Sequence, residues 1–153
     1  MRGTGVALFE GELMLIHKLI PTKPKHSKFE ALEHDAISMN EVVSEVYDII
    51  QKHKPDVIAI EFPCFTQSAK SAILIGMVWG CFANLLLHPD CYAIEPEALK
   101  KWSGSKRGDG KTKVGDKVLL RVDVETENDN VLDAIGICLM CKDQIKEYAN
   151  AII

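Results

Sequence analysis

The feature that most constrains the fold is a long helical pattern followed at once by a short, wholly apolar segment. Between residues 28 and 54 the apolar side chains recur at helical spacing, and Pro55 ends the run. Residues 57–60 (Val-Ile-Ala-Ile) are then apolar at every position, as in a strand that is buried on both faces of a sheet. A helix that leads into such a strand predicts an α/β fold with parallel strands.

Other segments supply the remaining elements of this predicted fold. Residues 5–9 and 13–20 have the apolar character of strands, and Gly11 lies where a hairpin turn requires a glycine. The other predicted elements are a nearly all-round apolar helix over 69–87, a short strand over 91–94, and helices over 96–102, 112–122 and 130–151. A chain of 153 residues that is 47% hydrophobic is expected to form one domain spanning 1–153.

The apolar segments and the cysteines set the expected compartment. The longest apolar stretch is interrupted by Gly76, Gly80 and Asn84, and no signal-peptide pattern precedes the first strand, so we expect neither a membrane span nor export. The five cysteines, an odd number, lie mostly inside apolar segments, at positions 64, 81, 91, 138 and 141. Reduced thiols in a cytoplasmic protein are the expected state.

Two small motifs have structural interpretations. Cys138 and Cys141 form a C-x-x-C pair, but they lie in an apolar run with no second pair and no nearby histidine. Because a structural zinc site needs four ligands, two buried helical thiols are the favoured interpretation. Gly76 and Gly80, four residues apart, are interpreted as a smooth patch for helix packing rather than as a ligand site.

Acidic residues lie at two places where α/β folds carry their sites. Glu61 directly follows the buried strand, at the carboxyl end of a predicted parallel strand. Asp129, Asn130 and Asp133 open the last helix, and their spacings place the first two on the face of Asp133. Helix capping, which contributes roughly 1 kcal/mol, explains Asp129 or Asn130. It explains Asp133 less well, because Asp133 lies in an otherwise apolar helix, where an unpaired carboxylate normally neutralises, finds a cation or binds metal.

A basic segment adds a second kind of candidate site. The net charge is −4, yet residues 100–117 carry an excess of five positive charges beside glycines 104, 108 and 110. Such runs are usually solvated surface. Here the segment accompanies a predicted metal site, and phosphodiester cleavage needs both phosphate anchoring and metal. The candidate DNA-binding residues are Lys100, Lys101, Lys106, Arg107, Lys113 and Lys117.

Five segments of the sequence, taken together, resemble a known protein family. They are residues 2–8 (Arg-Gly-Thr-Gly-Val-Ala-Leu), 54–61 (Lys-Pro-Asp-Val-Ile-Ala-Ile-Glu), 71–76 (Ser-Ala-Ile-Leu-Ile-Gly) with Gly80, 111–114 (Lys-Thr-Lys-Val) and 129–134 (Asp-Asn-Val-Leu-Asp-Ala). In this order they resemble the RuvC-type Holliday junction resolvases, which have the RNase H-like fold. The strand ending in Glu61 and the helix containing Asp133 are fairly specific in combination, and the likeness covers nearly the whole chain.

The resemblance implies a mixed sheet flanked by helices and a crossover junction endodeoxyribonuclease that depends on Mg²⁺ or Mn²⁺. It implies that the chain acts on branched DNA, such as a four-way junction, as a homodimer. Glu61 and Asp133 match catalytic, metal-binding acids of the family. Asn130 occupies the place of a further ligand, for which Asp129 is the alternative. Lys111 matches a catalytic lysine near the scissile phosphate, and Lys100 matches a second basic position.

One departure from the family pattern concerns the amino terminus. Family members begin with an apolar strand that carries the first catalytic aspartate, and this sequence starts after that strand. We expect the true start to lie upstream, because a core this complete is hard to stabilise around a missing central strand. The alternatives are a non-catalytic junction-binding or dimerisation module of the same fold, and an RNase H-like nuclease that acts on RNA.

Overall fold

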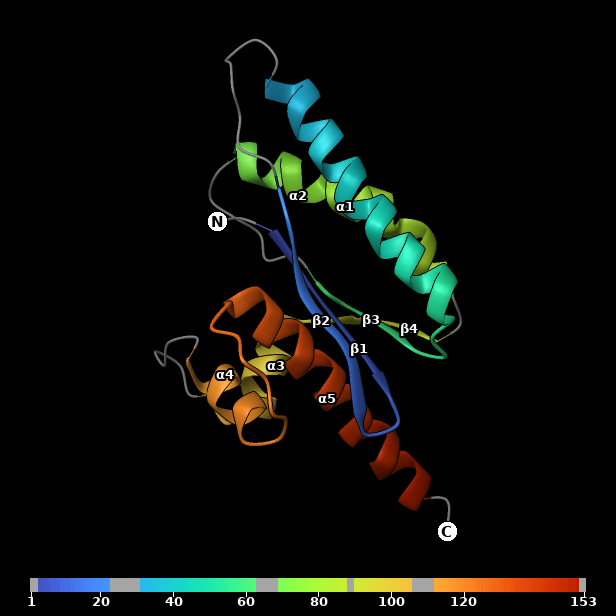
Figure 1. Ribbon diagram of the computed structural model, residues 1–153, viewed down its shortest axis with the longest axis vertical. Helices are drawn as coiled ribbons and strands as arrows, with labels where there is room; N and C mark the ends of the chain where they lie inside the picture. The colour runs from blue at the N-terminus through green and yellow to red at the C-terminus, as the bar shows by residue number, and fades with distance from the viewer. Residues whose placement is uncertain (1–2, 23–30, 63–68, 88–89, 106–111, 152–153) are drawn as a thin grey trace. The chain divides into compact units, whose positions relative to one another are not determined.

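The computed structural model describes residues 3–22, 31–62, 69–87, 90–105 and 112–151 (Figure 1). It has the predicted α/β class and the predicted order of strands and helices. The elements are β1 (Gly3–Glu10), β2 (Leu13–Pro21), α1 (Ala31–His53), β3 (Ile58–Glu61), α2 (Ala69–Phe82), the 3-10 helix η1 (Ala83–Leu87), β4 (Cys91–Ile94), α3 (Pro96–Ser103), α4 (Thr112–Leu119) and α5 (Asp129–Ala151).

The described strands pair as two separate two-stranded sheets, β1 with β2 and β3 with β4. The β1–β2 hairpin turns at Gly11, whose φ of 55° is readily adopted only by glycine. β3 and β4 run parallel, as the sequence predicts: the amide of Ile58 donates to the carbonyl of Asp90 at 3.0 Å, and that of Phe62 to the carbonyl of Ile94 at 2.6 Å. Antiparallel and parallel pairing are therefore both present.

The chain divides into two compact units. The first unit contains α1, α2, η1 and the beginning of β4, whereas the second contains the hairpin between residues 5 and 19, the end of β3, and α3, α4 and α5. The expectation of a single domain over 1–153 stays a prediction.

In the first unit, α1 packs against α2. Tyr47 of α1 stacks on Phe82 of α2 with ring centroids 6.4 Å apart, and its hydroxyl lies 3.4 Å from the carbonyl of Cys81. Val42 and Phe82 are buried there. Burial of these apolar side chains stabilises both helices.

Two predicted helices differ from the structure at their ends. The helix predicted over 69–87 is α-helical only to Phe82 and continues as η1, and the helix predicted over 112–122 ends at Leu119. Gly76 and Gly80 are exposed, and a Cβ on either would meet no described atom within 4 Å, so the predicted packing groove has no neighbour among the described residues. Within those residues, no helix is long and apolar enough to cross a membrane.

The second unit is built around α5, whose buried side chains include Val131, Ile135 and Leu139. α3 and α4 both pack on this helix, and α3 also packs on α4 (Figure 1). Gly136 lies where the three helices meet, because a Cβ there would lie 3.0 Å from Val114 and 3.3 Å from Leu99. A glycine at this point allows the helices to approach closely.

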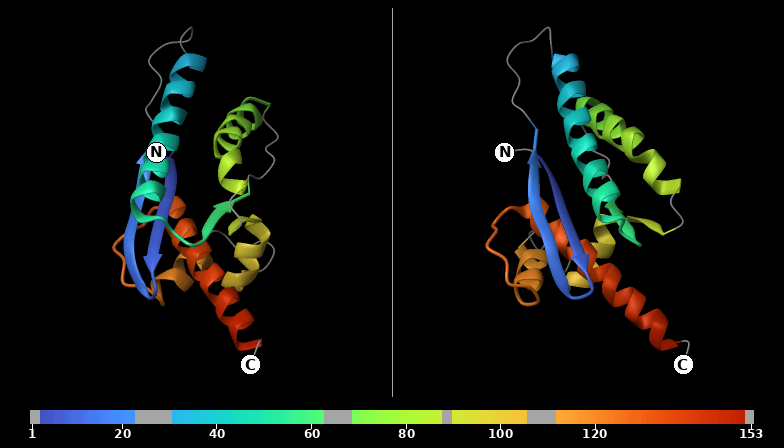
Figure 2. Two further views of the ribbon diagram at one scale, coloured as in Figure 1. Left: turned by 90° about the vertical axis from the view of Figure 1, so that its right-hand side faces the viewer. Right: turned by 45° about the vertical axis from the view of Figure 1, so that its right-hand side comes forward.

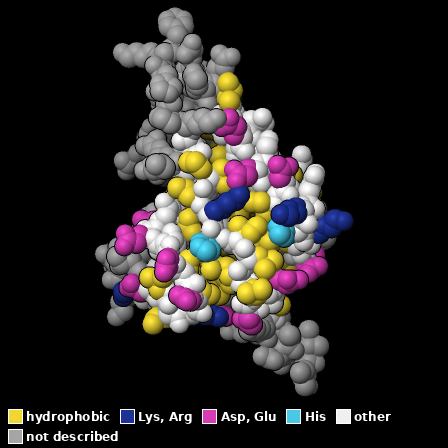
Figure 3. Space-filling view, in the orientation of Figure 1, with side chains coloured by type: hydrophobic (Ala, Val, Ile, Leu, Met, Phe, Trp, Pro, Cys, Tyr) yellow, Lys and Arg dark blue, Asp and Glu magenta, His cyan; other side chains and the backbone are white. Residues whose placement is uncertain are grey.

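The hairpin lies along α5 in both views of Figure 2. Ala7, Phe9 and Met14 pack against the core cluster that α5 contributes to. On the opposite face, Leu13 is 64% exposed and Leu15 is 42% exposed. Figure 3 shows hydrophobic side chains gathered over this hairpin. Apolar residues on both faces are typical of strands whose two faces are both covered by other parts of a protein.

Candidate functional site

Glu61 is the last residue of β3, and its side chain is exposed. The parallel pairing of β3 with β4 places Glu61 at the carboxyl end of a parallel strand, where the sequence predicted it. This end of a parallel sheet is where α/β folds position binding groups.

The N-terminus of α5 is capped by a residue that sequence reasoning missed. Asn128 Oδ1 accepts hydrogen bonds from the amides of Asn130 at 3.1 Å and Val131 at 3.4 Å, while the amide of Asn128 donates to Thr126 Oγ1 at 3.3 Å. The prediction that Asp129 or Asn130 caps this helix was therefore wrong. The signal was in the sequence, since asparagine is among the preferred N-cap residues.

Because Asn128 supplies the cap, capping does not account for the carboxylates in the first turns of α5. Asp129 is exposed and Asp133 is partly buried, and both line a pocket of about 200 Å³ between α4 and the beginning of α5. Asp116 and Glu127, which sequence reasoning did not single out, line the same pocket. Its walls are completed by Gly115, Leu119, Thr126 and Leu132.

Asn130 and Glu61 do not line this pocket. The carbonyl of Asn130 instead faces β1, because a Cβ built on Gly5 would lie 1.8 Å from that oxygen. Among the residues that the structure describes, no group of three or more histidine, cysteine, aspartate or glutamate side chains is close enough to hold a metal ion. The predicted acids are thus distributed between the pocket and the end of β3.

The predicted basic residues have different environments. Lys100 pairs with Glu97 of the same helix at 2.9 Å, Lys101 is exposed, and Lys113 is partly buried. Lys117 donates to the carbonyl of Trp102 and lies 4.1 Å above the centre of its ring. Lys106, Arg107 and Lys111 lie outside the described residues.

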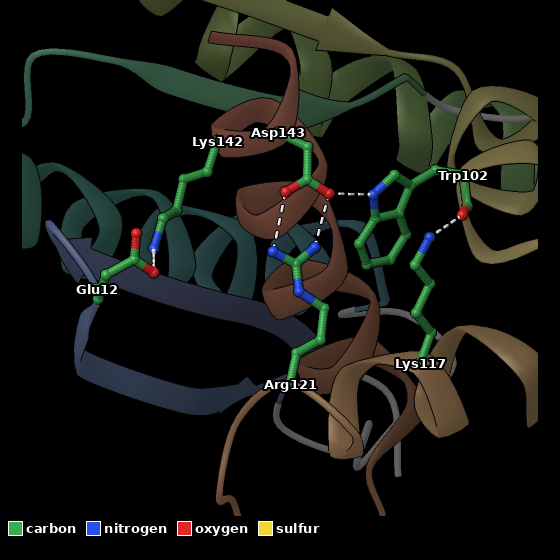
Figure 4. Close-up of polar contacts among 6 residues, drawn as sticks. All are labelled: Glu12, Trp102, Lys117, Arg121, Lys142 and Asp143. Carbon is green, nitrogen blue, oxygen red and sulfur yellow. Dashed lines mark hydrogen bonds and ion pairs between the residues drawn. The ribbon is translucent and has the colours of Figure 1, made fainter. Parts of the chain in front are cut away.

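Lys117 belongs to a polar cluster that joins α3, α4 and α5 (Figure 4). The indole N–H of Trp102 donates to Asp143 Oδ2 at 2.9 Å, and the Arg121 guanidinium donates to both carboxylate oxygens of Asp143, at 2.6 and 2.9 Å. These hydrogen bonds, with Arg121 as the main cause, hold the pKa of Asp143 below its ordinary value. The same pairing raises the pKa of Arg121.

The C-x-x-C pair lies on α5, as predicted. Cys141 is buried, Cys138 is partly buried, and neither forms a disulfide. The thiol of Cys138 donates to the carbonyl of Ala7 in β1, with 3.7 Å between sulfur and oxygen. Burial raises the pKa of Cys138 to about 12, so the group is a neutral packing thiol at physiological pH.

Comparison with solved structures places this architecture among known folds. A structure of RuvC from Thermus thermophilus superposes with a TM-score of 0.68 over 94% of this chain and 87% of that chain. The chain has the RuvC fold. T. thermophilus RuvC in complex with a Holliday junction substrate matches with the same TM-score and coverage. The sequence identity to RuvC is 17% in both comparisons.

No family model matches this sequence, and the comparison with curated proteins found no match. The likeness to RuvC thus rests on the course of the backbone. Coverage of 94% means that the matched backbone includes residues of both compact units.

Proposed function

We propose that this chain is a metal-dependent endonuclease that makes paired cuts in four-way or other branched DNA. The observation that carries the proposal is the RuvC fold over 94% of the chain, together with the fact that a RuvC of this fold is solved with a Holliday junction substrate. Fold alone does not determine function. The residues at the predicted positions supply the additional support.

The donor set suits Mg²⁺ or Mn²⁺. Asp129 and Asp133 line one pocket, and Glu61 lies at the carboxyl end of β3. Carboxylate oxygens are hard ligands, and Mg²⁺ is commonly held by one or two of them together with substrate phosphates. Two pocket carboxylates therefore fit such an ion, although a complete three-ligand group is absent from the described residues. When bound, the metal would supply an activated water and charge stabilisation.

The remaining residues would bind and orient DNA. Asp116 and Glu127 beside the pocket make its local charge negative, so phosphate would need compensating positive charge to approach. Lys101 and Lys113 are described residues that can provide it, because each neutralised phosphate contributes to affinity. By resemblance, Lys111 would offset charge on the scissile phosphate itself.

Paired cuts in a symmetric junction require two active sites, so the proposal includes a homodimer. The sequence from 72 to 87 contains no charged residue, and Gly76, Met77, Gly80 and Leu87 within it are exposed. Depletion of charge is a property of the central part of protein interfaces. This face of α2 and η1 supports a contact between two copies.

A second candidate is a junction-binding or dimerisation module without catalysis. The observation that favours it is the absence, within the described residues, of three clustered metal-ligating side chains. It shares the fold, the basic residues and the dimer with the first candidate.

The experiment compares binding with cleavage on a labelled four-way DNA junction. Binding is measured in Ca²⁺ and cleavage in Mg²⁺ or Mn²⁺, with linear duplex and structured RNA as competing substrates. The nuclease proposal expects junction cleavage that is lost in Glu61→Gln and Asp133→Asn while junction binding persists. Tight binding without cleavage in either metal would favour the second candidate. Preferential cleavage of RNA would contradict both.

A further inference from the structure

The cluster around Trp102 lies at the point where the chain leaves α3. Trp102 is the penultimate residue of that helix, and the connection that follows carries two of the predicted DNA-binding residues, Lys106 and Arg107. Gly104 ends the helix in the left-handed conformation, with a φ of 78°. Its amide donates to the carbonyl of Lys101 at 3.1 Å, and that of Ser105 donates to the carbonyl of Lys100 at 3.0 Å. The exit from α3 therefore has a defined geometry up to Ser105.

Trp102 is held by Asp143 of α5 and by Lys117 of α4. Asp143 of α5 accepts a hydrogen bond from its indole N–H, and Arg121, in the turn after α4, fixes the carboxylate of Asp143 by donating to both of its oxygens (Figure 4). Lys117 of α4 covers the ring at 4.1 Å and also bonds the Trp102 carbonyl. Cations over an indole ring and charge-assisted hydrogen bonds are among the stronger polar contacts in proteins.

These contacts already engage the charge of Lys117. Its ammonium is shared between a carbonyl and an aromatic face, and its side chain is partly buried. An ammonium that must leave such contacts in order to reach a phosphate would lose them. Lys101, by contrast, lies exposed on α3.

We propose that Trp102 is a positioning residue that fixes the exit of the chain from α3, and that Lys117 acts within this cluster rather than on a DNA phosphate. The inference rests on the proposed function, because the geometry of the exit from α3 affects junction binding only if the chain binds junctions. It changes the role predicted for Lys117 from a phosphate contact to a contact that supports the end of α3.

The test measures junction affinity in Ca²⁺ at several salt concentrations for the wild type, Trp102→Phe, Lys117→Met and Lys101→Ala. The salt dependence is the slope of the logarithm of the binding constant against the logarithm of the salt concentration. Loss of one phosphate contact makes this slope less steep by about 0.9. We expect this reduction only in Lys101→Ala. Trp102→Phe and Lys117→Met are expected to weaken binding by about three- to tenfold, the effect of one lost hydrogen bond, with the wild-type salt dependence.

A second measurement needs no DNA. Amide hydrogen exchange at Gly104 and Ser105 is expected to be faster in Trp102→Phe by up to about tenfold and unchanged in Lys101→Ala. A smaller salt dependence in Lys117→Met would overturn the role assigned to Lys117. Wild-type affinity and exchange in Trp102→Phe would overturn the role of Trp102. If the wild type binds no junction, the proposed function fails, and the exchange rates alone then decide whether Trp102 fixes the exit.

Discussion

Gly5 of β1 lies so close to the carbonyl of Asn130 in α5 that a Cβ on Gly5 would lie 1.8 Å from its oxygen. This contact joins the hairpin to the first turn of the helix that carries the candidate acids. No side chain fits between the two backbones without moving one of them.

Gly5→Ala is expected to lower the free energy of unfolding by about 1–3 kcal/mol or more, because the added methyl group overlaps backbone rather than a movable side chain. Urea unfolding measures the change. Gly76→Ala is the matched control, because that helical glycine is exposed and a Cβ there has open space. The control is expected to be neutral or stabilising by up to about 1 kcal/mol. Equal behaviour of the two variants would contradict the close approach.

Asp129→Asn is expected to reduce cleavage and Mn²⁺ affinity by at least about tenfold, and more than Asn130→Ala does. The reason is that Asp129 shares a pocket with Asp133, whereas Asn130 does not line that pocket. Cleavage rates against metal concentration, together with calorimetric titration of Mn²⁺, make the comparison. A larger loss in Asn130→Ala would assign the ligand to Asn130, as the family resemblance does.

Asp143→Asn is expected to destabilise the chain by about 1–2 kcal/mol at neutral pH, because it weakens a bidentate pairing with Arg121. Since the pKa of Asp143 is lower in the folded state, its stabilisation is complete above the unfolded-state pKa of roughly 4 and is lost as the pH falls through the folded-state value. The difference in unfolding free energy between variant and wild type should therefore shrink in acid. Asp123→Asn, at an exposed aspartate, is the control. A difference that is independent of pH would contradict the ion pair.

Cys81 is expected to react with a thiol reagent in the native protein, whereas Cys138 and Cys141 react only after unfolding. Cys81 is exposed, Cys141 is buried, and the pKa of Cys138 is raised to about 12, which leaves almost no thiolate at neutral pH. Peptide mass spectrometry after brief alkylation gives the order of labelling. Early labelling of Cys138 would show that the hairpin separates from α5 readily.

Extension of the amino terminus by an apolar strand ending in aspartate is expected to raise the rate of junction cleavage with little change in junction affinity. The described strands form two separate pairs, and the added carboxylate would hold metal rather than the DNA backbone. Cleavage in Mg²⁺ and binding in Ca²⁺ are compared for the two chains, with an extension ending in asparagine as the control. Equal cleavage by all three would show that the added aspartate is not a ligand.

The elements of this fold were predictable because their signals are local. The helical spacing before Pro55, the apolar residues of β3 and the glycine at the hairpin turn each lie within a short window of sequence. The position of Glu61 at the end of a parallel strand followed from those elements. The change from α2 to η1 was missed because periodicity does not distinguish an α-helix from a 3-10 continuation.

The surroundings of the candidate site were less predictable because they depend on distant residues. Trp102 meets Asp143 across 41 positions of sequence, so Lys117 appeared to be one more surface cation. Asp116 counted only as a negative charge in a basic segment until the fold placed it beside Asp129. Asn128 was overlooked because adjacent acids offered an equally good cap.

The hairpin and α5 are made at very different times during synthesis. Ala7 meets Cys138 across 131 positions, and Glu12 pairs with Lys142 at 3.0 Å across 130. At about 5–20 residues per second, the ribosome takes on the order of ten seconds to make the chain between these partners. Until then α5 does not cover the inward face of the hairpin. The nascent chain therefore exposes an apolar, aggregation-prone pair of strands. A chaperone that holds the β1–β2 hairpin during this interval would therefore raise the yield of folded protein.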